Sequence, residues 1–312
     1  MDKVFITGIS GFLGSNIAKV LLNNGHQIIA NYREGSSKEL CLEFGEHITW
    51  ILQDEQDEWV DKVIAWSPSV IIHSAWLGVG HQHRDSWEMQ SLNIDYLQKI
   101  LTIAGRSKAK QFIGLGSQGE YGVYDGCIDE NYPLAPTEAY GRVKLVCAEL
   151  VKQYAAQYGI AWYWLRLFSF FGKGEANNWL IPSLVKKILT ESDMDLTAGE
   201  QKYSYLYVND LGLAVNKIIA KGGTSGIYNI SGKKIMALKD LVGNIRDKIN
   251  PSFQLNFGKL PYRANQSMHL QGNSAKFVKT FGEFDVSDFD ASLSATIEYF
   301  TNKFKEQLNE GI

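Results

Sequence analysis

The chain has 312 residues, of which 45% are hydrophobic and 21% are charged, and its formal net charge is −3. This is the balance of a folded globular protein rather than of a disordered chain. So small a net charge creates no overall positive field to attract nucleic acid or an anionic membrane surface, and we expect neither as a partner.

The start of the chain and its cysteines indicate a cytoplasmic protein. The first residues, MDKVFITG, contain no basic segment followed by a long apolar one, so we expect no secretion signal. No apolar run approaches the roughly 20 residues that a membrane-spanning helix needs. Cys41, Cys127 and Cys147 form no C-x-x-C pair. An odd number of scattered cysteines argues against a disulfide framework or a structural zinc site.

Apolar strands alternate with helical patterns through the first half of the chain. Strands are predicted at 4–6, 27–31, 48–52, 70–73, 111–115 and 162–168, and helices at 12–24, 86–104 and 138–158. Such alternation is typical of parallel strands joined by helical crossovers that cover both faces of a sheet. We therefore predict an α/β fold with a Rossmann-type doubly wound parallel sheet. Its ligands should bind at the carboxyl ends of the strands.

The last third of the chain is less regular and is predicted to form a smaller α/β lobe. It contains helical patterns at 182–189 and 238–249 and a strand at 226–230, with no linker-like stretch before them. We predict an NADP-binding domain over 1–170, to which 203–231 returns, and a substrate-binding lobe from 171–202 and 232–312.

A glycine-rich turn follows the first predicted strand. In VFITGISGFLGS, Gly8, Gly11 and Gly14 allow positive φ and a close approach of pyrophosphate to the backbone. Free N–H groups at the start of the next helix would face the phosphates. A tight strand–helix turn without a ligand is the competing interpretation. The predicted cofactor contacts in this turn are Gly8, Ser10, Gly11, Phe12, Leu13 and Gly14.

The end of the second strand predicts which dinucleotide is used. It reads NYR, with no carboxylate before Glu34. Enzymes that prefer NAD usually have an acid there for the ribose 2′-hydroxyl, whereas a guanidinium pairs with a 2′-phosphate. We predict NADP(H), with Arg33 as the main ligand and Ser36 or Ser37 assisting, and NAD as the alternative. A solvated surface arginine is the competing interpretation.

Tyr140, Lys144 and Ser117 are the predicted catalytic residues. Tyr140 and Lys144 stand four apart in EAYGRVK, which places them on one face of a helix. The ammonium can then favour the ionised phenol and lower its pKa, which is ordinarily about 10. Ser117 follows an apolar strand, so its hydroxyl should emerge at the carboxyl edge of the sheet and orient a substrate oxygen. An ordinary helix surface and a strand-end serine are the competing interpretations.

The G-x-x-G-x-x-G spacing, the Tyr-x-x-x-Lys pair and the preceding serine together resemble the extended short-chain dehydrogenase/reductase family, of the NAD-dependent epimerase/dehydratase type. The pattern is most similar to that of nucleotide-sugar 4-ketoreductases such as CDP-abequose synthase, with LIPSLV and AGEQK as further matching segments. Asn93, Arg166 and Asp210 resemble other family landmarks, and Asn93 is expected to brace backbone near the site. The resemblance implies further cofactor contacts: Asp54 with the adenine, Lys144 with the nicotinamide ribose, and also Ser74, Ala75, Trp76 and Tyr140.

The residues after Ser117 predict the reaction class. Related dehydratases carry an acid pair there, and GDP-fucose synthase has a cysteine two places on, whereas this chain has Gln118 and Gly119. The resemblance therefore implies NADPH-dependent reduction of a keto group, with C4 favoured, on a nucleotide-linked deoxysugar, with Tyr140 as general acid. A 4-epimerase with tightly bound NAD is the alternative. A non-catalytic NADP-binding regulatory protein is the second alternative.

A nucleotide-diphosphate sugar needs cationic ligands. The family's Arg-Asp before VNDL is replaced here by Tyr203-Ser204, with Lys202 adjacent, and Arg263 matches a late arginine of the family. The predicted substrate contacts are Ser117, Gln118, Asn178, Lys202 and Arg263.

We predict no metal site, because His81 and His83 share a loop without a clear third ligand. The helices at 86–104 and 138–158 could pair across a two-fold axis, as in many relatives, and we expect a homodimer.

Overall fold

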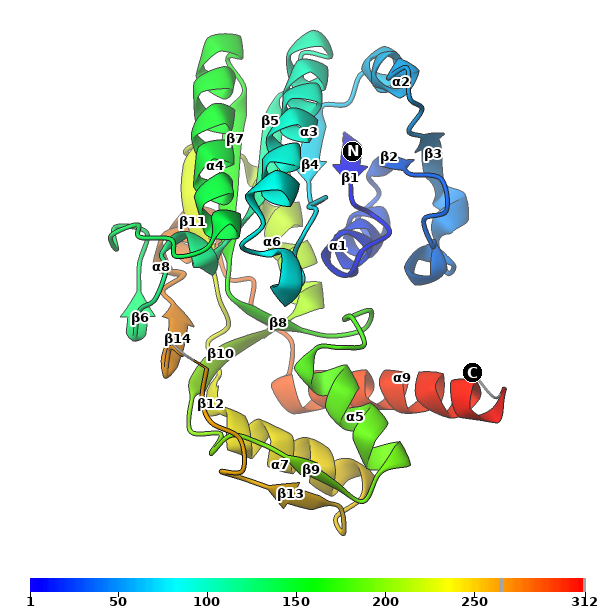
Figure 1. Cartoon of the computed structure of the whole chain (residues 1–312). Coiled ribbons are helices and arrows are strands. Elements are labelled where there is room, and N and C mark those ends of the chain that lie inside the picture. The colour runs from blue at the N-terminus through cyan, green and yellow to red at the C-terminus, as the bar shows by residue number, and fades with distance from the viewer. Residues whose placement is uncertain (264–265, 311–312) are drawn as a thin grey trace.

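Seven parallel strands form the main sheet of the structure, a computed structural model that describes residues 1–263 and 266–310. Across the sheet the order is β11 (Gly226–Ile230), β7 (Ala161–Leu167), β5 (Gln111–Ser117), β4 (Val70–His73), β1 (Lys3–Thr7), β2 (Gln27–Tyr32) and β3 (Ile48–Leu52). The direction of winding reverses between β1 and β4, and ligands of such sheets bind at this reversal. The predicted α/β fold with a Rossmann-type doubly wound sheet is confirmed (Figure 1).

Helices cover both faces of this sheet, and each face has its own apolar core. One face carries α1 (Phe12–Asn23), α6 (Val208–Lys221) and α8 (Ala275–Phe281), and the other carries α2 (Glu58–Trp66), α3 (Trp87–Arg106) and α4 (Ala139–Tyr158). Successive side chains of β1 point to opposite faces of the sheet and so enter different cores. Phe5 packs in the core that contains Leu97, and Ile6 in the core that contains Leu211. Within the described residues, no helix combines the length and apolar character needed to cross a membrane.

A smaller lobe lies below the carboxyl edge of the main sheet in Figure 1. Its helices are α5 (Leu180–Thr190), α7 (Leu238–Ile249) and α9 (Phe289–Asn309), which share an apolar core. Its strands are β9 (Asp193–Asp195), β13 (Gln254–Asn256), β10 (Lys202–Tyr207), β12 (Ile235–Ala237), β14 (His269–Gly272), β6 (Gly126–Ile128) and β8 (Ser169–Phe171). β9 pairs with β13, whereas β10 pairs with β8, β12 and β14, and β14 pairs with β6.

The chain passes between the lobes more than once. β10 belongs to the small sheet, the following helix α6 packs against α1, and β11 is an edge strand of the main sheet. The predicted division, with 203–231 returning to the cofactor lobe, stays a prediction.

A glycine allows α1 and α6 to pack closely. A Cβ on Gly212 of α6 would lie 2.6 Å from Cγ2 of Val20 and 3.2 Å from the carbonyl oxygen of Asn16, both in α1. Because α1 starts at the glycine-rich turn, this packing also supports the backbone at the carboxyl edge.

We predict that Gly212→Ala destabilises the fold by about 1–3 kcal/mol, because the methyl group would overpack a closed helix contact. Urea unfolding followed by circular dichroism measures this change. Gly243→Ala in α7 is the matched control, since a Cβ there would meet no described atom within 4 Å. That substitution should leave stability unchanged or raise it by up to about 1 kcal/mol. Equal effects of the two substitutions would contradict the packing argument.

Candidate active site

The turn between β1 and α1 forms an open cradle of backbone. Gly8 has a φ of +69°, and a Cβ there would lie 2.6 Å from the amide nitrogen of Ala75. A Cβ on Gly14 would clash with the carbonyl oxygen of Gly8, so both positions require glycine. Gly11, the N-cap of α1, has no side chain that could cap the helix. The first amide groups of α1 are thus available to a phosphate, which fits a bound dinucleotide.

The turn after β4 is tied to the glycine turn. Thr7, at the end of β1, shares a hydrogen bond through Oγ1 with Nδ1 of His73 at 3.0 Å, and its Oγ1 accepts the amide N–H of Ala75 at 3.2 Å. The other predicted cofactor contacts on these two turns are all partly exposed: Ser10, Phe12, Leu13, Ser74 and Trp76. The structure therefore brings both predicted sets of cofactor contacts to the same edge of the sheet.

Lys144 is buried next to the turn after β4. The residue is 4% exposed. Its Nζ donates to the carbonyl oxygen of Leu115 at 2.6 Å and lies 3.4 Å from the centroid of the Trp76 ring. Burial lowers the pKa of Lys144 to about 7, because desolvation disfavours the charged form. Near neutral pH the ammonium and amine forms of Lys144 are therefore present in comparable amounts.

Tyr140 lies one helical turn before Lys144 and is 7% exposed. The guanidinium carbon of Arg84 lies 4.2 Å from its ring centroid. Burial raises the pKa of the phenol, while hydrogen bonding with Ser117 and the charge of Arg84 oppose this rise. The expectation that Lys144 lowers this pKa is therefore corrected. The Lys144 ammonium is 5.8 Å from the Tyr140 ring centroid. Burial also lowers the pKa of Lys144, so that a smaller fraction of it carries a positive charge.

Ser117 is the last residue of β5 and faces Tyr140 from the neighbouring element. Its hydroxyl accepts the amide N–H of Gly119 at 3.1 Å, within the short helical turn η4 (Gln118–Glu120). Gln118 is partly exposed beside it. The structure thus gathers the three predicted catalytic residues from β5 and α4 at one point of the carboxyl edge.

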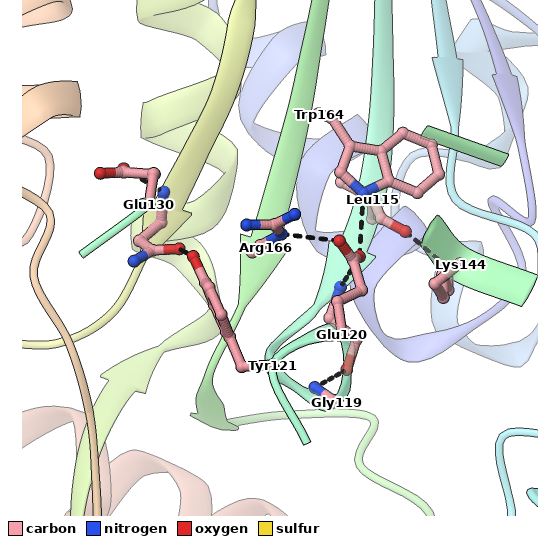
Figure 2. A network of polar contacts seen from close by, with 10 residues as sticks. Leu115, Gly119, Glu120, Tyr121, Glu130, Lys144, Trp164 and Arg166 are labelled. Carbon is pink, nitrogen blue, oxygen red and sulfur yellow. Dashed lines mark hydrogen bonds and ion pairs between the residues drawn. The ribbon is translucent and has the colours of Figure 1, made fainter. Parts of the chain in front are cut away.

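A buried ion pair holds the turn after Ser117, and sequence reasoning missed its acidic member. Glu120 is fully buried and accepts hydrogen bonds from the Ser117 amide at 2.9 Å, the Trp164 indole at 2.9 Å and Nε of Arg166 at 2.6 Å. Figure 2 shows these groups converging on the carboxylate. Arg166, which is 1% exposed, also lies over the Tyr121 ring, 4.6 Å from its centroid. The capping-box spacing of Ser117 and Glu120, Ser-x-x-Glu directly after an apolar strand, was the sequence signal for the buried acid.

The end of β2 carries two cations. Arg33 follows the strand directly and is exposed. Nζ of Lys38 lies 3.6 Å from the ring centroid of Tyr32, the last residue of β2, and 4.4 Å from that of Trp50 on β3. Sequence reasoning missed Lys38, although it directly follows Ser36 and Ser37, because its position over the two rings is a feature of the folded chain.

Asp54 has a defined structural role. Its carboxylate accepts the amide N–H groups of Glu58 at 2.7 Å and Trp59 at 3.1 Å, at the start of α2. Helix capping of this kind satisfies backbone donors that the helix leaves open. The predicted contact of Asp54 with adenine stays a prediction.

The two predicted cationic phosphate ligands, Lys202 and Arg263, are both exposed side chains of the smaller lobe. The charge of Arg263 acts on the phenol of Tyr203, so these two residues lie close together. Lys202 precedes Tyr203 on the strand and is exposed, and successive strand residues point to opposite faces. Asn178 is exposed in the segment before α5.

The described side chains contain no group of three or more His, Cys, Asp or Glu residues arranged to hold a metal ion. The side chain of His81 lies outside the described residues. His83 approaches the side chain of Gln82 at 3.1 Å through its Nε2.

Comparison with known proteins matches the chain to one family. Residues 4–231 match the model of the NAD dependent epimerase/dehydratase family. The chain is 29% identical to dTDP-6-deoxy-L-talose 4-dehydrogenase (NAD(+)) of Aggregatibacter actinomycetemcomitans over 86% of this chain and 99% of that protein. It is 25% identical to CDP-abequose synthase of Salmonella muenchen over 88% of this chain and 89% of that protein.

Solved structures share the fold across both lobes. UDP-N-acetylglucosamine 4-epimerase from Methanobrevibacter ruminantium M1, in complex with UDP-N-acetylmuramic acid, superposes with a TM-score of 0.86. The match covers 97% of this chain and 99% of that one at 22% identity. Similarity at this level establishes the architecture.

We predict that Lys144→Met stabilises the unliganded chain, and more at pH 6 than at pH 9. The pKa of Lys144 is about 7 in the folded chain against 10.5 ordinarily, so between these values the unfolded chain binds a proton that the folded chain does not. Wild-type stability therefore rises with pH across this window relative to the variant. The gain from the substitution should shrink by roughly 2–3 kcal/mol between the two pH values. Urea unfolding at both pH values tests this, and a gain independent of pH would contradict it.

Proposed function

Because the chain belongs to the NAD dependent epimerase/dehydratase family, we propose that it is a nucleotide-sugar oxidoreductase that reduces a keto group, at C4 of a deoxysugar, with NADPH. One observation carries this proposal: Ser117, Tyr140 and Lys144 meet at the carboxyl edge of the sheet, beside the glycine cradle. The two named relatives, a 4-dehydrogenase and CDP-abequose synthase, support the substrate class.

The chain's own groups supply positioning and proton transfer. A bound NADPH supplies the hydride that reduces the keto carbon to an alcohol carbon, leaving NADP⁺. Tyr140 donates its phenolic proton to the keto oxygen, and solvent returns that proton later. The Ser117 hydroxyl hydrogen-bonds the same oxygen and shares its developing charge. Burial keeps the Tyr140 phenol protonated at neutral pH, as a general acid requires.

The residues around Ser117 favour reduction over reactions that need extra acid–base groups. Gln118 and Gly119 provide no carboxylate or thiol beside the reacting centre. Glu120, the nearest acid along the chain, is occupied by Arg166, Trp164 and the backbone. A 4-epimerase with bound NAD is the alternative, because the structural relative named above is a 4-epimerase.

The choice of NADPH rests on the cations at the end of β2. Arg33 and Lys38 lie at the strand end that faces the adenosine ribose in this fold, and β2 itself contains no acid. The name of one relative specifies NAD(+), so NAD is the alternative.

We also propose a cytoplasmic homodimer, as expected from the sequence. The exposed side chains Leu92 of α3 and Val146 of α4 support pairing through these two helices.

We predict that the chain oxidises NADPH on addition of a nucleotide-linked 4-keto-6-deoxysugar, and that Tyr140→Phe lowers kcat by about 10²- to 10⁴-fold. The assay follows NADPH absorbance with a panel of CDP-, GDP- and dTDP-linked ketosugars. Fluorescence titration should show unchanged NADPH binding by the variant. Interconversion of 4-hydroxy sugars without net cofactor consumption would instead identify an epimerase. Undiminished activity of the variant would reject Tyr140 as the acid.

We predict that Arg33→Ser raises the KM for NADPH by about 10- to 100-fold and leaves that for NADH nearly unchanged, because a charge-assisted bond to the 2′-phosphate is lost. Arg106→Ser is the matched control, since Arg106 is an exposed arginine at the far end of α3. Equal losses with both cofactors would contradict the assignment of Arg33.

A further inference from the structure

The segment between β4 and α3 reaches across to the first turn of the helix that carries Tyr140. The carbonyl oxygen of Arg84 accepts the amide N–H of Tyr140 at 2.7 Å. Oδ1 of Asp85 accepts the amide N–H of Ala139 at 3.1 Å. The N-cap of α4, Glu138, provides no side-chain cap of its own within the described residues. Two donors that the helix leaves open are therefore satisfied by a distant part of the chain.

The Arg84 side chain continues this contact to the phenol. Its Nε donates to Oε2 of Glu138 at 2.7 Å, and its guanidinium carbon lies 4.2 Å from the Tyr140 ring centroid. A Cβ on Gly119 would lie 3.3 Å from Nη2 of Arg84 and 3.4 Å from Oγ of Ser117. The guanidinium therefore borders the same small space as the Ser117 hydroxyl.

The segment is braced so that Arg84 keeps this place. Asn93 of α3 accepts the Leu77 amide N–H at 2.7 Å and donates to the Leu77 carbonyl at 3.2 Å. Gln90, also of α3, donates to the carbonyl oxygens of Gly78 at 2.8 Å and His83 at 3.0 Å. Both side chains are buried, so the backbone leading to Arg84 is fixed on both sides of the loop.

The groups that act on the phenol come from the loop before α3, from η4, from the end of β5 and from the N-cap of α4. Arg84 contributes a positive charge from the loop, and Glu120 and Glu138 contribute opposing negative charges, while Ser117 contributes a hydrogen bond. The guanidinium is protonated at every accessible pH. Lys144 is farther from the ring, and its pKa of about 7 makes its charge depend on pH. Arg84 is thus the permanent cation next to the phenol.

We propose that Arg84 is a positioning residue for Tyr140: its backbone and its bond to Glu138 fix the first turn of α4, and its guanidinium over the ring stabilises the negative charge that forms when the phenol gives up its proton. The proposal rests on the proposed function, in which Tyr140 is the proton donor. It explains how a deeply buried phenol can release a proton when the neighbouring lysine is only partly charged.

The test compares two single substitutions with opposite charge effects, Arg84→Met and Glu138→Gln. Removing the guanidinium should raise the pKa of Tyr140 by about one unit. Glu138→Gln keeps the shape of the bond to Arg84 and removes a negative charge, so it should lower the pKa of Tyr140. Arg84→Lys keeps the charge and should fall between wild type and Arg84→Met. The pKa is read from ¹³Cζ-tyrosine NMR of the NADP⁺-bound chain, with the resonance assigned by Tyr140→Phe.

Opposite shifts of the two variants support the proposal, and shifts in the same direction or no shifts overturn it. The pH profile of kcat for the reverse, alcohol-oxidising reaction provides the functional readout, because that reaction needs the ionised phenol. Its rising limb should move to higher pH in Arg84→Met and to lower pH in Glu138→Gln. The NMR titration needs no sugar substrate, so a chain that turned over no ketosugar but showed opposite shifts would reject the proposed function and retain the role of Arg84. Thermal melts verify that both variants are folded.

Discussion

The buried pair of Glu120 and Arg166 fixes the geometry on which the rest of the site depends. Glu120 neutralises the arginine inside the protein and at the same time binds the amide of Ser117, which defines where β5 ends. A buried charge without its partner would cost several kcal/mol, so the strand end, the following turn and β7 are fixed together. Leu115, two residues earlier on β5, then receives the ammonium of Lys144. The Ser117 and Lys144 side chains thus take their positions from a charge pair that is itself buried.

The pattern of strands, helices and glycines was enough to predict the strands of the main sheet and three of the helices that cover it, α1, α3 and α4. Residues 138–158, expected as a helix, form α4 (Ala139–Tyr158), and 111–115, expected as a strand, form the first part of β5. These elements are long and strongly apolar on the faces they bury, so local periodicity identifies them. The glycine turn could also be predicted from the sequence, and the structure shows that a side chain at Gly8 or Gly14 would collide with backbone.

The rest of the site depends on contacts between distant segments, which no local pattern contains. Arg84 acts on Tyr140 from another element, and Lys38 of the loop after β2 lies over the ring of Trp50 on β3. The charge balance around Tyr140 was misjudged for the same reason. Helical spacing correctly placed Lys144 on the same helix face as Tyr140. Burial lowers the pKa of Lys144 and raises that of the Tyr140 phenol, and this burial is a property of the folded chain alone.

The pairing of Glu120 with Arg166 also bears on how the chain folds during synthesis. Glu120 leaves the ribosome 46 residues before its partner, and β7, which carries Arg166, must pair with β5 before the two charges can meet. Until then the carboxylate remains hydrated, and the turn at Ser117 lacks its internal acceptor. The turn at Ser117 is therefore completed only after β7 has emerged, in a step that depends on a non-local strand pairing.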